Sequence, residues 1–455
     1  MNLVAHVKRK VRKYSEGAEG GRRILIAISG GVDSMVLTDI MARISHDTLH
    51  TMGLAHINYG IRPDADEAET LSAQTADKLK CRFHSANFTD GTRLGSFEKW
   101  AREVRYAYLA KVAREHGYQW IFTAHHRDDQ IETLYMRYMQ NADWISMQGI
   151  REQLGLIRRP LLNIDKKHLV DYAMLNDLTW IDDPTNRDQR YLRNKIRHSV
   201  LPGVRTSEPE LIDRLIRISA NAKRKFTKLK KDLNIDAVVS GHHPSGYVQI
   251  KKVEFLKLSD DKKKIVIKSL VTDYLGKSEI SLSGSHWVSF WQFIHNAVTG
   301  TVFELCMDIF SIMDRESVCL TCEKKQKISK KKLNRIRKTR WTNHLFKIDS
   351  LSADSYEKSS DKRFMVLPEN MIADGIFVRQ WKKGDIIQVD KDRHHVKVSD
   401  LFINHKIPVM EKWKYPVVVT QGDKILWIPG LAHAFIDFGG GKLERNNIKI
   451  ECLWT

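Results

Sequence analysis

Over its first 200 residues the chain alternates short apolar runs with longer segments in which apolar residues recur every three or four positions. The apolar runs predict strands at residues 24–29, 51–58, 81–88 and 119–126. The periodic segments predict helices at residues 32–44, 64–80 and 96–117, with a further helix after residue 126. Strands and helices that alternate in this way form a parallel sheet covered by helices. We therefore predict an α/β fold whose N-terminal domain is a doubly wound, Rossmann-like parallel sheet.

The pattern changes after residue 205, where mostly charged helical segments follow at residues 210–233 and 251–275. Beyond a polar segment at 351–363, typical of a linker, apolar runs predict strands at residues 386–389, 415–420 and 424–430. A chain of 455 residues is too long for one ordinary core. We expect a catalytic domain over residues 1–205, a basic, mainly helical domain over residues 206–350 and a small α+β domain over residues 351–455.

Charge favours a polyanionic partner, because 75 Lys and Arg stand against 55 Asp and Glu, a formal net charge of +20. The densest basic run, residues 323–340, is typical of either a solvated linker or a nucleic-acid-binding strip. No apolar stretch reaches the roughly 18 residues of a membrane helix, and the N-terminus lacks the apolar region of a secretory signal. Five scattered cysteines form no disulfide framework and fit a reducing compartment. We expect a cytoplasmic protein without membrane contact.

The segment "SGGVDS" at residues 29–34 joins the first predicted strand to the first predicted helix. The free N–H groups and partial positive charge of a helix N-terminus bind anions, and glycines let the backbone approach a phosphate. The lysine of a Walker A loop is absent, and Asp33 stands there instead. A carboxylate beside phosphates is explained by Mg²⁺, which binds one or two carboxylates plus phosphate oxygens. The structural alternative is that Ser29, Asp33 or Ser34 caps the helix.

A second polar segment, "AHHRDDQIE" at residues 124–132, follows the fourth predicted strand and belongs to the same edge of the sheet. Asp129 and Glu132 have the spacing of a capping box, so capping alone would account for both carboxylates. His125 or His126 is a candidate phosphate contact or proton acceptor, because histidine titrates near neutral pH. Structural histidines at a strand end would read the same.

Two groups of arginines are candidate anion contacts. Arg102 and Arg105 share one face of the helix 96–117, where they would neutralise pyrophosphate or hold an RNA backbone unless they are solvated surface residues. The second group follows the turn "DDPTN" and would contact RNA phosphates; it comprises Arg190, Arg193, Lys195 and Arg197.

"SGGVDS" resembles the PP-loop of the N-type ATP pyrophosphatases, which cut ATP between its α and β phosphates. Further stretches follow one another in the order and spacing of the tRNA(Ile)-lysidine synthetase family. They are "AHINYGIRPDADEAE", "FEKWAREVRY", "TAHHRDDQIETLYMR", "IRRPLL", "DDPTNRDQRYLRNKIRHSVLP" and, in the last domain, "VRQWKKGDII", "VSDLFINHKIPVMEKWKYPVV" and "KILWIPGL". The resemblance covers nearly the whole chain, although residues 220–370 contribute length and basicity more than motif.

The resemblance implies an ATP-dependent ligase that forms a carbon–nitrogen bond on an isoleucine tRNA with a CAU anticodon. ATP adenylates the wobble cytidine at its C2 oxygen, and the side-chain amine of L-lysine then displaces AMP to give lysidine. No protein partner is required, and both later domains are expected to bind tRNA. The implied ATP-binding residues are Ser29, Gly30, Gly31, Val32, Asp33 and Ser34, with Mg²⁺ on Asp33 and Asp129. The implied catalytic residues are Asp33, Arg105, His125, Asp129 and Glu132, and the implied tRNA-binding residues are Arg190, Arg193, Asn194 and Arg197.

Two positions depart from the family pattern, and one rival function stays open. Tyr59 stands where the family has a histidine after Asn58, and Glu411-Lys412 stands where an arginine is expected. The rival is a PP-loop enzyme that thiolates tRNA, which also activates a base by adenylation. Cys81 is the only cysteine in the first 300 residues, which disfavours that rival because such an enzyme needs a sulfur carrier.

Overall fold

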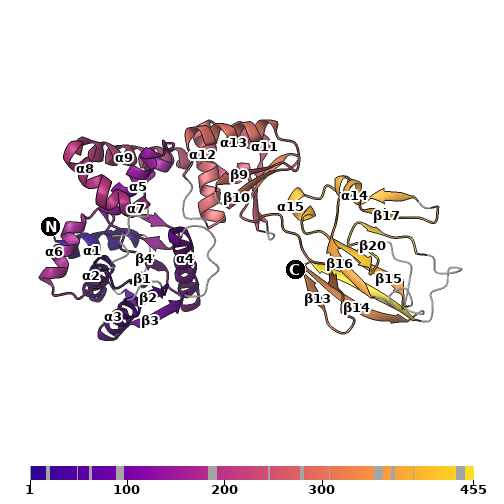
Figure 1. Ribbon diagram of the computed structural model, residues 1–455, viewed down its shortest axis with the longest axis horizontal. Coiled ribbons are helices and arrows are strands. Elements are labelled where there is room, and N and C mark those ends of the chain that lie inside the picture. The colour runs from indigo at the N-terminus through magenta and orange to yellow at the C-terminus, as the bar shows by residue number, and fades with distance from the viewer. Residues whose placement is uncertain are drawn as a thin grey trace. The chain divides into compact units, whose positions relative to one another are not determined.

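The computed structural model describes residues 2–16, 21–48, 50–60, 64–88, 97–182, 192–243, 246–276, 281–306, 308–352, 362–369, 375–392, 394–436 and 446–454. The chain divides into two compact units (Figure 1). The first unit is Met1–Asp232 with Ile280–Gly284, and the second is Leu233–Glu279 with Ser285–Thr455. The predicted domain limits at residues 205 and 350 stay predictions.

A six-stranded sheet forms the centre of the first unit, in the order β3-β2-β1-β4-β6-β5. Its strands are β1 (Arg23–Ala27), β2 (Thr51–Asn58), β3 (Arg82–Asn87), β4 (Trp120–Phe122), β5 (Gln153–Leu154) and β6 (Ile157–Arg158). All neighbouring pairs are parallel except β5 with β6 at the edge. The four predicted strands and the mostly parallel sheet are confirmed.

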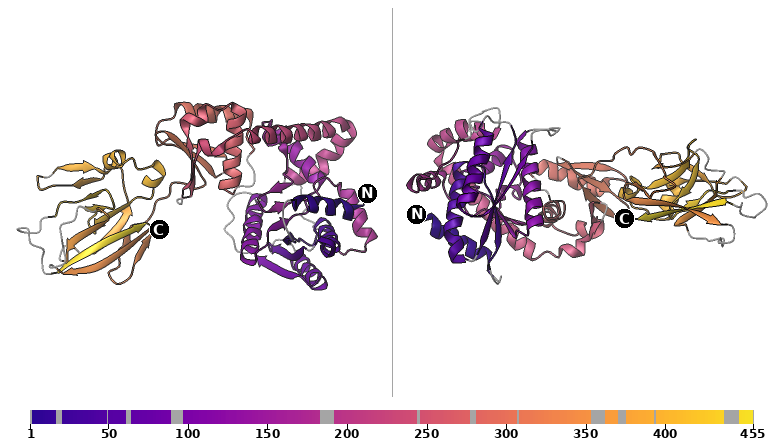
Figure 2. Two further views of the ribbon diagram at one scale, coloured as in Figure 1. Left: turned by 180° about the vertical axis from the view of Figure 1, so that it is seen from behind. Right: turned by 90° about the horizontal axis from the view of Figure 1, so that it is seen from below.

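Helices cover both faces of this sheet (Figure 2). They are α1 (Leu3–Tyr14), α2 (Val32–Thr48), α3 (Ala65–Lys78), α4 (Phe97–His116) and α6 (Lys166–Leu175). In β1, Ile24 and Ile26 pack with α1, α2 and α6, whereas Leu25 packs with α4 on the opposite face. Because this part of the strand is covered on both faces, its residues Ile24–Ile26 are all apolar and fully buried.

The chain order reverses between β1 and β4, since β1 has β2 on its other side. Loops that leave the carboxyl ends of strands at such a switch point diverge and open a ligand crevice. β1 leads into α2, and β4 leads into α5 (Arg127–Met139). The N–H of Arg127 donates to the carbonyl of Ile164 at 2.9 Å, just before α6 begins. The N-termini of α5 and α6 are therefore joined at the edge of the sheet where α2 begins.

The rest of the first unit packs on α5. The segments are η1 (Ser146–Gln148), α7 (Leu192–Lys195), a π-helical turn η3 (Ile196–Val200), α8 (Leu201–Ser207) and α9 (Pro209–Lys231). Leu134 of α5 is fully buried among apolar residues that include Leu201 of α8 and Leu215 of α9. This packing holds the segment 192–231 against α5.

The second unit begins with helices and a five-stranded antiparallel sheet in the order β7-β8-β11-β10-β9. The helices are α10 (Ile235–Val238), α11 (Lys252–Leu256), α12 (Asp260–Ser269), a π-helical turn η4 (Leu270–Tyr274) and α13 (Gly284–Asn296). The strands are β7 (Val239–His243), β8 (Tyr247–Lys251), β9 (Val302–Cys306), β10 (Ile309–Met313) and β11 (Ser317–Thr321). The helical segment predicted at 251–275 is confirmed, and the sheet is an addition that the hydrophobic pattern did not predict.

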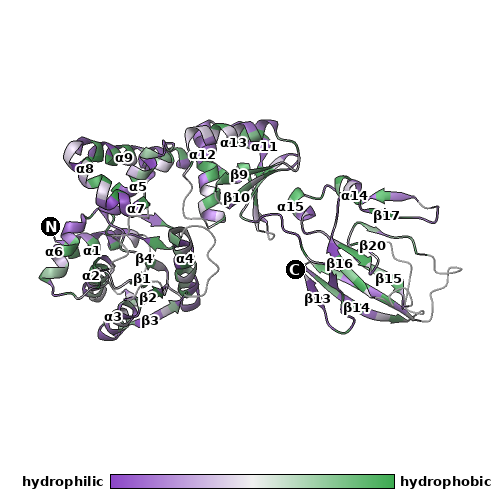
Figure 3. Cartoon of the chain, viewed as in Figure 1, coloured by the Kyte–Doolittle hydropathy of each residue, from purple (hydrophilic) through white to green (hydrophobic). Residues whose placement is uncertain are grey.

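The C-terminal part of the second unit contains two sheets, β12-β16-β19-β20-β21 and β13-β14-β22-β15, and a two-stranded ribbon of β17 and β18. Its strands are β12 (Lys331–Lys332), β13 (Thr339–Trp341), β14 (His344–Ser352), β15 (Phe364–Pro368), β16 (Ile376–Gln380), β17 (Ile386–Gln388), β18 (His395–Lys397), β19 (Pro416–Thr420), β20 (Ile425–Ile428), β21 (Ala432–His433) and β22 (Asn446–Trp454). Two short helices, α14 (Val398–Asn404) and α15 (Val409–Lys412), accompany them. The predicted strands correspond to β17, β19 and β20, and β20 is strongly hydrophobic (Figure 3).

Two segments that resembled linkers connect or form strands of these sheets. The basic run 323–340 contains β12, which pairs with β16, and its Leu333 is buried in the core. Most of the run is nevertheless exposed and connects β11 to β12, so both the linker and the nucleic-acid alternative stay open. The polar segment 351–363 begins in β14 and ends just before β15, and both strands pair with β22. This segment, of which residues 353–361 lie outside the described residues, joins two strands of one sheet. Within the described part of the chain, no helix has both the length and the apolar character of a membrane span.

Candidate active site

The turn between β1 and α2 requires glycine at position 30. Gly30 has a φ of +79°, in the left-handed region. A Cβ there would lie 3.1 Å from the Cβ of Ala68, so a larger residue would be strained and crowded. The Ser34 hydroxyl accepts a hydrogen bond from Ser29 N–H at 3.1 Å and donates one to the Gly31 carbonyl at 2.8 Å. Ser34 therefore holds the turn together, and these two bonds do not cap an N–H group of α2.

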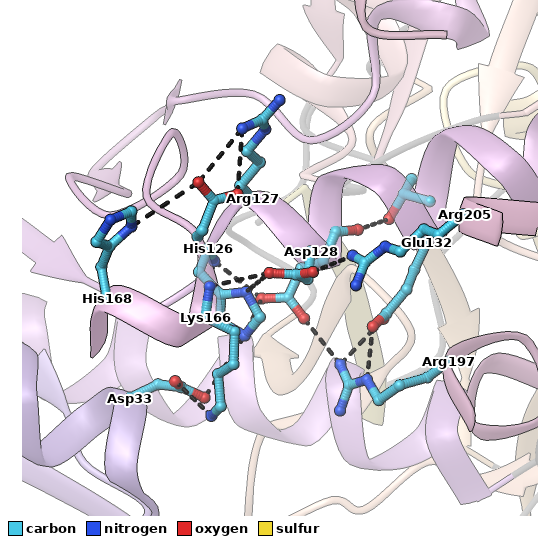
Figure 4. A network of polar contacts seen from close by, with 12 residues as sticks. Asp33, His126, Arg127, Asp128, Glu132, Lys166, His168, Arg197 and Arg205 are labelled. Carbon is cyan, nitrogen blue, oxygen red and sulfur yellow. Dashed lines mark hydrogen bonds and ion pairs between the residues drawn. The ribbon is translucent and has the colours of Figure 1, made fainter. Parts of the chain in front are cut away.

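Asp33 lies in the first turn of α2, where the helix begins on this turn. Its Oδ1 accepts a hydrogen bond from Lys166 Nζ at 2.6 Å, and its Oδ2 lies 3.6 Å from His126 Nε2 (Figure 4). No described residue accepts a hydrogen bond from the N–H groups of Val32 or Asp33. Free N–H groups at the start of a helix are the donors of a phosphate site.

Reciprocal contacts dock the N-terminus of α6 on that of α5. Asp128 Oδ2 accepts from the Lys166 N–H at 2.9 Å, and the Arg127 guanidinium donates to Asp165 Oδ1 at 3.1 Å (Figure 4). Arg205 of α8 donates to the other oxygen of Asp128. Burial acts to raise the pKa of Asp128, but the bonds from Lys166 N–H and Arg205 outweigh it and lower that pKa. Asp128 is thus ionised and binds two later segments, through the Lys166 N–H of α6 and the Arg205 guanidinium of α8.

Asp129 and Glu132 are held by two arginines. Asp129 Oδ2 accepts from the His126 N–H at 2.9 Å, so the cap of α5 joins His126 and Asp129 and not Asp129 and Glu132, as the spacing had suggested. The Oδ1 of Asp129 accepts from Arg193 at 2.9 Å and from Arg197 at 3.1 Å. Glu132 is 1% exposed and accepts from Arg193 at 2.8 Å and from Arg197 at 2.5 Å. The two arginines that were predicted to bind RNA phosphates therefore pair with two of the predicted catalytic carboxylates.

The charges around Asp129 keep it ionised. Burial acts to raise its pKa, but His126, Arg193 and the bond from the His126 N–H hold the pKa of Asp129 far below its usual range. Among the described residues, no group of three or more His, Cys, Asp or Glu side chains could by itself enclose a metal ion. A metal at this site would therefore need ligands from a bound nucleotide as well.

His125 lies near three arginines and one carboxylate, Asp129. Its Nδ1 lies 3.0 Å from the Thr123 hydroxyl. Burial, and next the positive charge of Arg159, hold the pKa of His125 well below its usual value. Arg159 is 2% exposed and donates to Tyr106 OH at 3.1 Å and to a backbone carbonyl at 2.6 Å. His125 is therefore neutral and a weak base.

The remaining predicted residues lie apart or outside the description. Arg105 is exposed, and its Nε donates to Tyr59 OH at 3.2 Å rather than to the acids of α5. Arg102 is the arginine of that helix whose charge lowers the pKa of His125. Asn194 lies on α7 next to Arg193. Arg190 falls outside the described residues, as does the "DDPTN" turn from residue 183 onward.

Comparison with known proteins separates the chain into two matched regions. A model of the PP-loop domain matches residues 3–204, and a model of the TilS substrate C-terminal domain matches residues 376–438. The tRNA(Ile)-lysidine synthase of Bacillus subtilis (strain 168) is 25% identical over 439 residues, which cover 92% of this chain and 91% of the relative. That of Persephonella marina is 28% identical over 433 residues, covering 92% and 93%. That of Streptococcus sanguinis is 31% identical over 236 residues, covering 50% and 53%.

The chain belongs to the tRNA(Ile)-lysidine synthase family. Nearly every residue of the site described above falls within the PP-loop match, and this match implies that the first unit binds ATP. The second match runs from β16 to just beyond β21, so the family assignment rests on both units.

Four polar residues of this synthase-family site did not emerge from the sequence. Lys166 follows the apolar run of residues 161–164 and looks like any cation in the first turn of a helix. Arg159 stands in the motif "IRRPLL", which marks the position but does not show what the side chain contacts. Asp128 lies within the segment 124–132, and Arg205 lies eight residues beyond Arg197. The contacts of Lys166, Asp128 and Arg205 that build the site span from 38 to 133 residues along the chain, so only the fold reveals them.

Proposed function

We propose that this protein is a tRNA(Ile)-lysidine synthase, which converts the wobble cytidine of an isoleucine tRNA with a CAU anticodon into lysidine. The product reads an isoleucine codon in place of the methionine codon. The observation that carries the proposal is the convergence of the glycine turn, Asp33 and the Asp129–Glu132 pair at one switch point of the parallel sheet. The relatives named as lysidine synthases, which match over most of the chain, support it.

The first step is adenylation of the base. The cytidine C2 oxygen attacks the α-phosphorus of ATP, the bond from this phosphorus to the bridging oxygen breaks, and pyrophosphate leaves with the electron pair. The turn Ser29–Ser34 would bind the phosphates through its N–H groups. Asp33 fits a Mg²⁺ ligand, because it is partly exposed and its Oδ2 accepts no close hydrogen bond from a described residue. The ion would neutralise phosphate charge when bound.

Asp129 fits a metal less well than Asp33. Its two oxygens already accept hydrogen bonds from one backbone N–H and two arginines, which a metal would have to displace. We therefore assign Asp129 to the second step together with Glu132. The ε-amine of lysine attacks C2, the C2–O bond breaks, and AMP leaves with the electron pair. The negative charge of the two side chains would attract the incoming ammonium, whose reference pKa is near 10.4. Because the pKa of Asp129 lies far below its usual range, the proton that the amine releases would pass on to water and would not stay on Asp129.

Other predicted residues keep supporting roles in this proposal. His125 is neutral, so its ring N–H would donate a hydrogen bond to a substrate oxygen. With its lowered pKa it would not serve as the proton acceptor. Arg105 is exposed and would contact the phosphate backbone of the tRNA. The segment that carries Arg193, Asn194 and Arg197 would line the RNA path, with Arg190 as a further predicted contact. The basic run 323–340 of the second unit supplies cations for the remainder of the tRNA.

The test is incorporation of radiolabelled lysine into acid-precipitable RNA, with ATP, Mg²⁺ and a transcript of isoleucine tRNA bearing CAU. We expect lysine- and ATP-dependent incorporation that disappears in Asp33→Ala. A methionine tRNA transcript with the same anticodon serves as the control for selectivity. Pyrophosphate release that depends on tRNA but yields no lysine incorporation would refute the proposal and restore the thiolating enzyme as the better reading.

A further inference from the structure

The first turn of α6 brings a lysine to the PP-loop turn from a point 133 residues further along the chain. Lys166 Nζ donates to Asp33 Oδ1 at 2.6 Å, and both side chains are partly exposed (Figure 4). A Walker A loop carries its phosphate-binding lysine within the loop, and the turn 29–34 has none. Lys166 therefore supplies an ammonium beside a phosphate-type loop that has no cation of its own.

The backbone of Lys166 is fixed, whereas its ammonium is free to turn. The Lys166 N–H is held by Asp128 Oδ2 at 2.9 Å, and the preceding residue Asp165 is held by Arg127 at 3.1 Å. Within the described residues, Asp33 is the one group bonded to the Lys166 ammonium. A lysine has a flexible four-carbon stem, so its ammonium can exchange one anion for another while α6 stays in place.

The surroundings of this ammonium favour an anion with several oxygens. The N-termini of α2, α5 and α6 all lie beside the Asp33–Lys166 pair, and each carries a partial positive charge (Figure 4). His126 is 5% exposed, and its Nδ1 makes no hydrogen bond with a described residue, the nearest carboxylate oxygen being 3.7 Å away on Asp128. A phosphate chain would provide acceptors for these groups that the single carboxylate of Asp33 does not.

We propose that Lys166 is a phosphate-binding residue of the nucleotide site. It pairs with Asp33 in the free protein and with the β- and γ-phosphates of ATP in the complex, where Asp33 turns to Mg²⁺. The inference rests on the proposed function, since it takes ATP as the ligand of this turn. In the adenylation step the electron pair of the broken bond leaves with pyrophosphate, and the Lys166 ammonium stabilises that added charge.

The experiment compares Lys166→Met with Lys167→Met in the full-length protein. Lys167 is the next residue of α6, is exposed, and makes no ion pair with a described residue, so it controls for loss of one positive charge. Isothermal titration calorimetry would measure binding of ATP with Mg²⁺ and, separately, of AMP, without tRNA or lysine. We expect Lys166→Met to weaken ATP binding by about tenfold or more and AMP binding by less than about twofold, because AMP lacks the β- and γ-phosphates. Lys167→Met should change neither.

Two outcomes would overturn the inference. Unchanged ATP affinity in Lys166→Met would remove Lys166 from the site, and an equal loss for ATP and AMP would mean that the ion pair only shapes the turn. Lys166→Arg keeps the charge, so it should retain most of the ATP affinity and provides a second variant if the methionine variant folds poorly. Because the binding assay contains neither tRNA nor lysine, failure to form lysidine would refute the proposed function without affecting this result.

Discussion

Replacing Glu132 with alanine should lower the melting temperature of the first unit by about 6–12 °C. Glu132 is 1% exposed and accepts hydrogen bonds from both Arg193 and Arg197. Removing one partner of a buried ion pair costs about 3–5 kcal/mol, because the other charge stays in a low-dielectric site. The side chains of Arg193 and Arg197 are 26% and 31% exposed, which favours the lower end, about 3 kcal/mol. In a unit of this size, 1 kcal/mol corresponds to roughly 2–4 °C.

Differential scanning calorimetry of the full chain would measure this effect, with Glu115→Ala as the control. Glu115 and Lys111 form an exposed pair at 4.0 Å, which contributes about 0.5 kcal/mol or less. The double variant Glu132→Ala/Arg197→Met should recover roughly half of the loss, because Arg193 and Asp129 then remain as a balanced pair. A melting temperature for Glu132→Ala equal to that of the control would refute the reasoning about burial.

Three further predictions concern His125, the PP-loop turn and the basic run 323–340. The pKa of His125 lies below the reference value of 6.5. The stability that this shift contributes is fully present above pH 6.5 and is lost as the pH falls towards the folded-state pKa. Arg159→Gln should raise the pKa of His125, which an NMR titration of labelled histidine would measure. Gly30→Ala should destabilise the first unit by about 1–3 kcal/mol in thermal unfolding, whereas Gly31→Ala, whose Cβ would meet nothing closer than 3.6 Å, should cost less than about 1 kcal/mol. Arg337→Ser should weaken tRNA binding and reduce the slope of log affinity against log salt by about 1, measured by filter binding at several salt concentrations.

The sequence was informative wherever local pattern and burial coincide. The run "ILIAI" predicts a strand covered on both faces, and β1 has that environment. The runs "IFSIM" and "SVCLT" form β10 and β11 and are fully buried, yet the sheet they belong to was not predicted. Their signal was present, but a five-residue apolar run does not by itself distinguish a strand from a buried helix segment.

The partners of the site carboxylates were beyond the reach of local pattern. The spacing of Asp129 and Glu132 suggested a capping box between these two residues, but the cap of α5 joins His126 and Asp129, and both acids also bind arginines. Arg193 and Arg197 read as RNA contacts because a basic cluster after a turn is usually exposed. Only the packing of α8 and α9 on α5 brings these arginines, more than 60 residues away in sequence, onto the acids.

The charges of this site balance one another, and this balance decides whether a substitution mainly weakens ligand binding or mainly lowers stability. Four carboxylates from α2 and α5 meet four cations from the segment 166–205: the acids are Asp33, Asp128, Asp129 and Glu132, and the cations are Lys166, Arg193, Arg197 and Arg205. The net charge of these eight side chains is near zero. Neither a polyphosphate nor an ammonium ion is therefore repelled by a site that carries only its own sign of charge. Loss of a partly exposed cation such as Lys166 would leave a carboxylate facing the phosphates, so it should reduce ATP affinity more than stability. Loss of the buried Glu132 should do the reverse, since the half-buried Arg193 and Arg197 would lose the acceptor that they share.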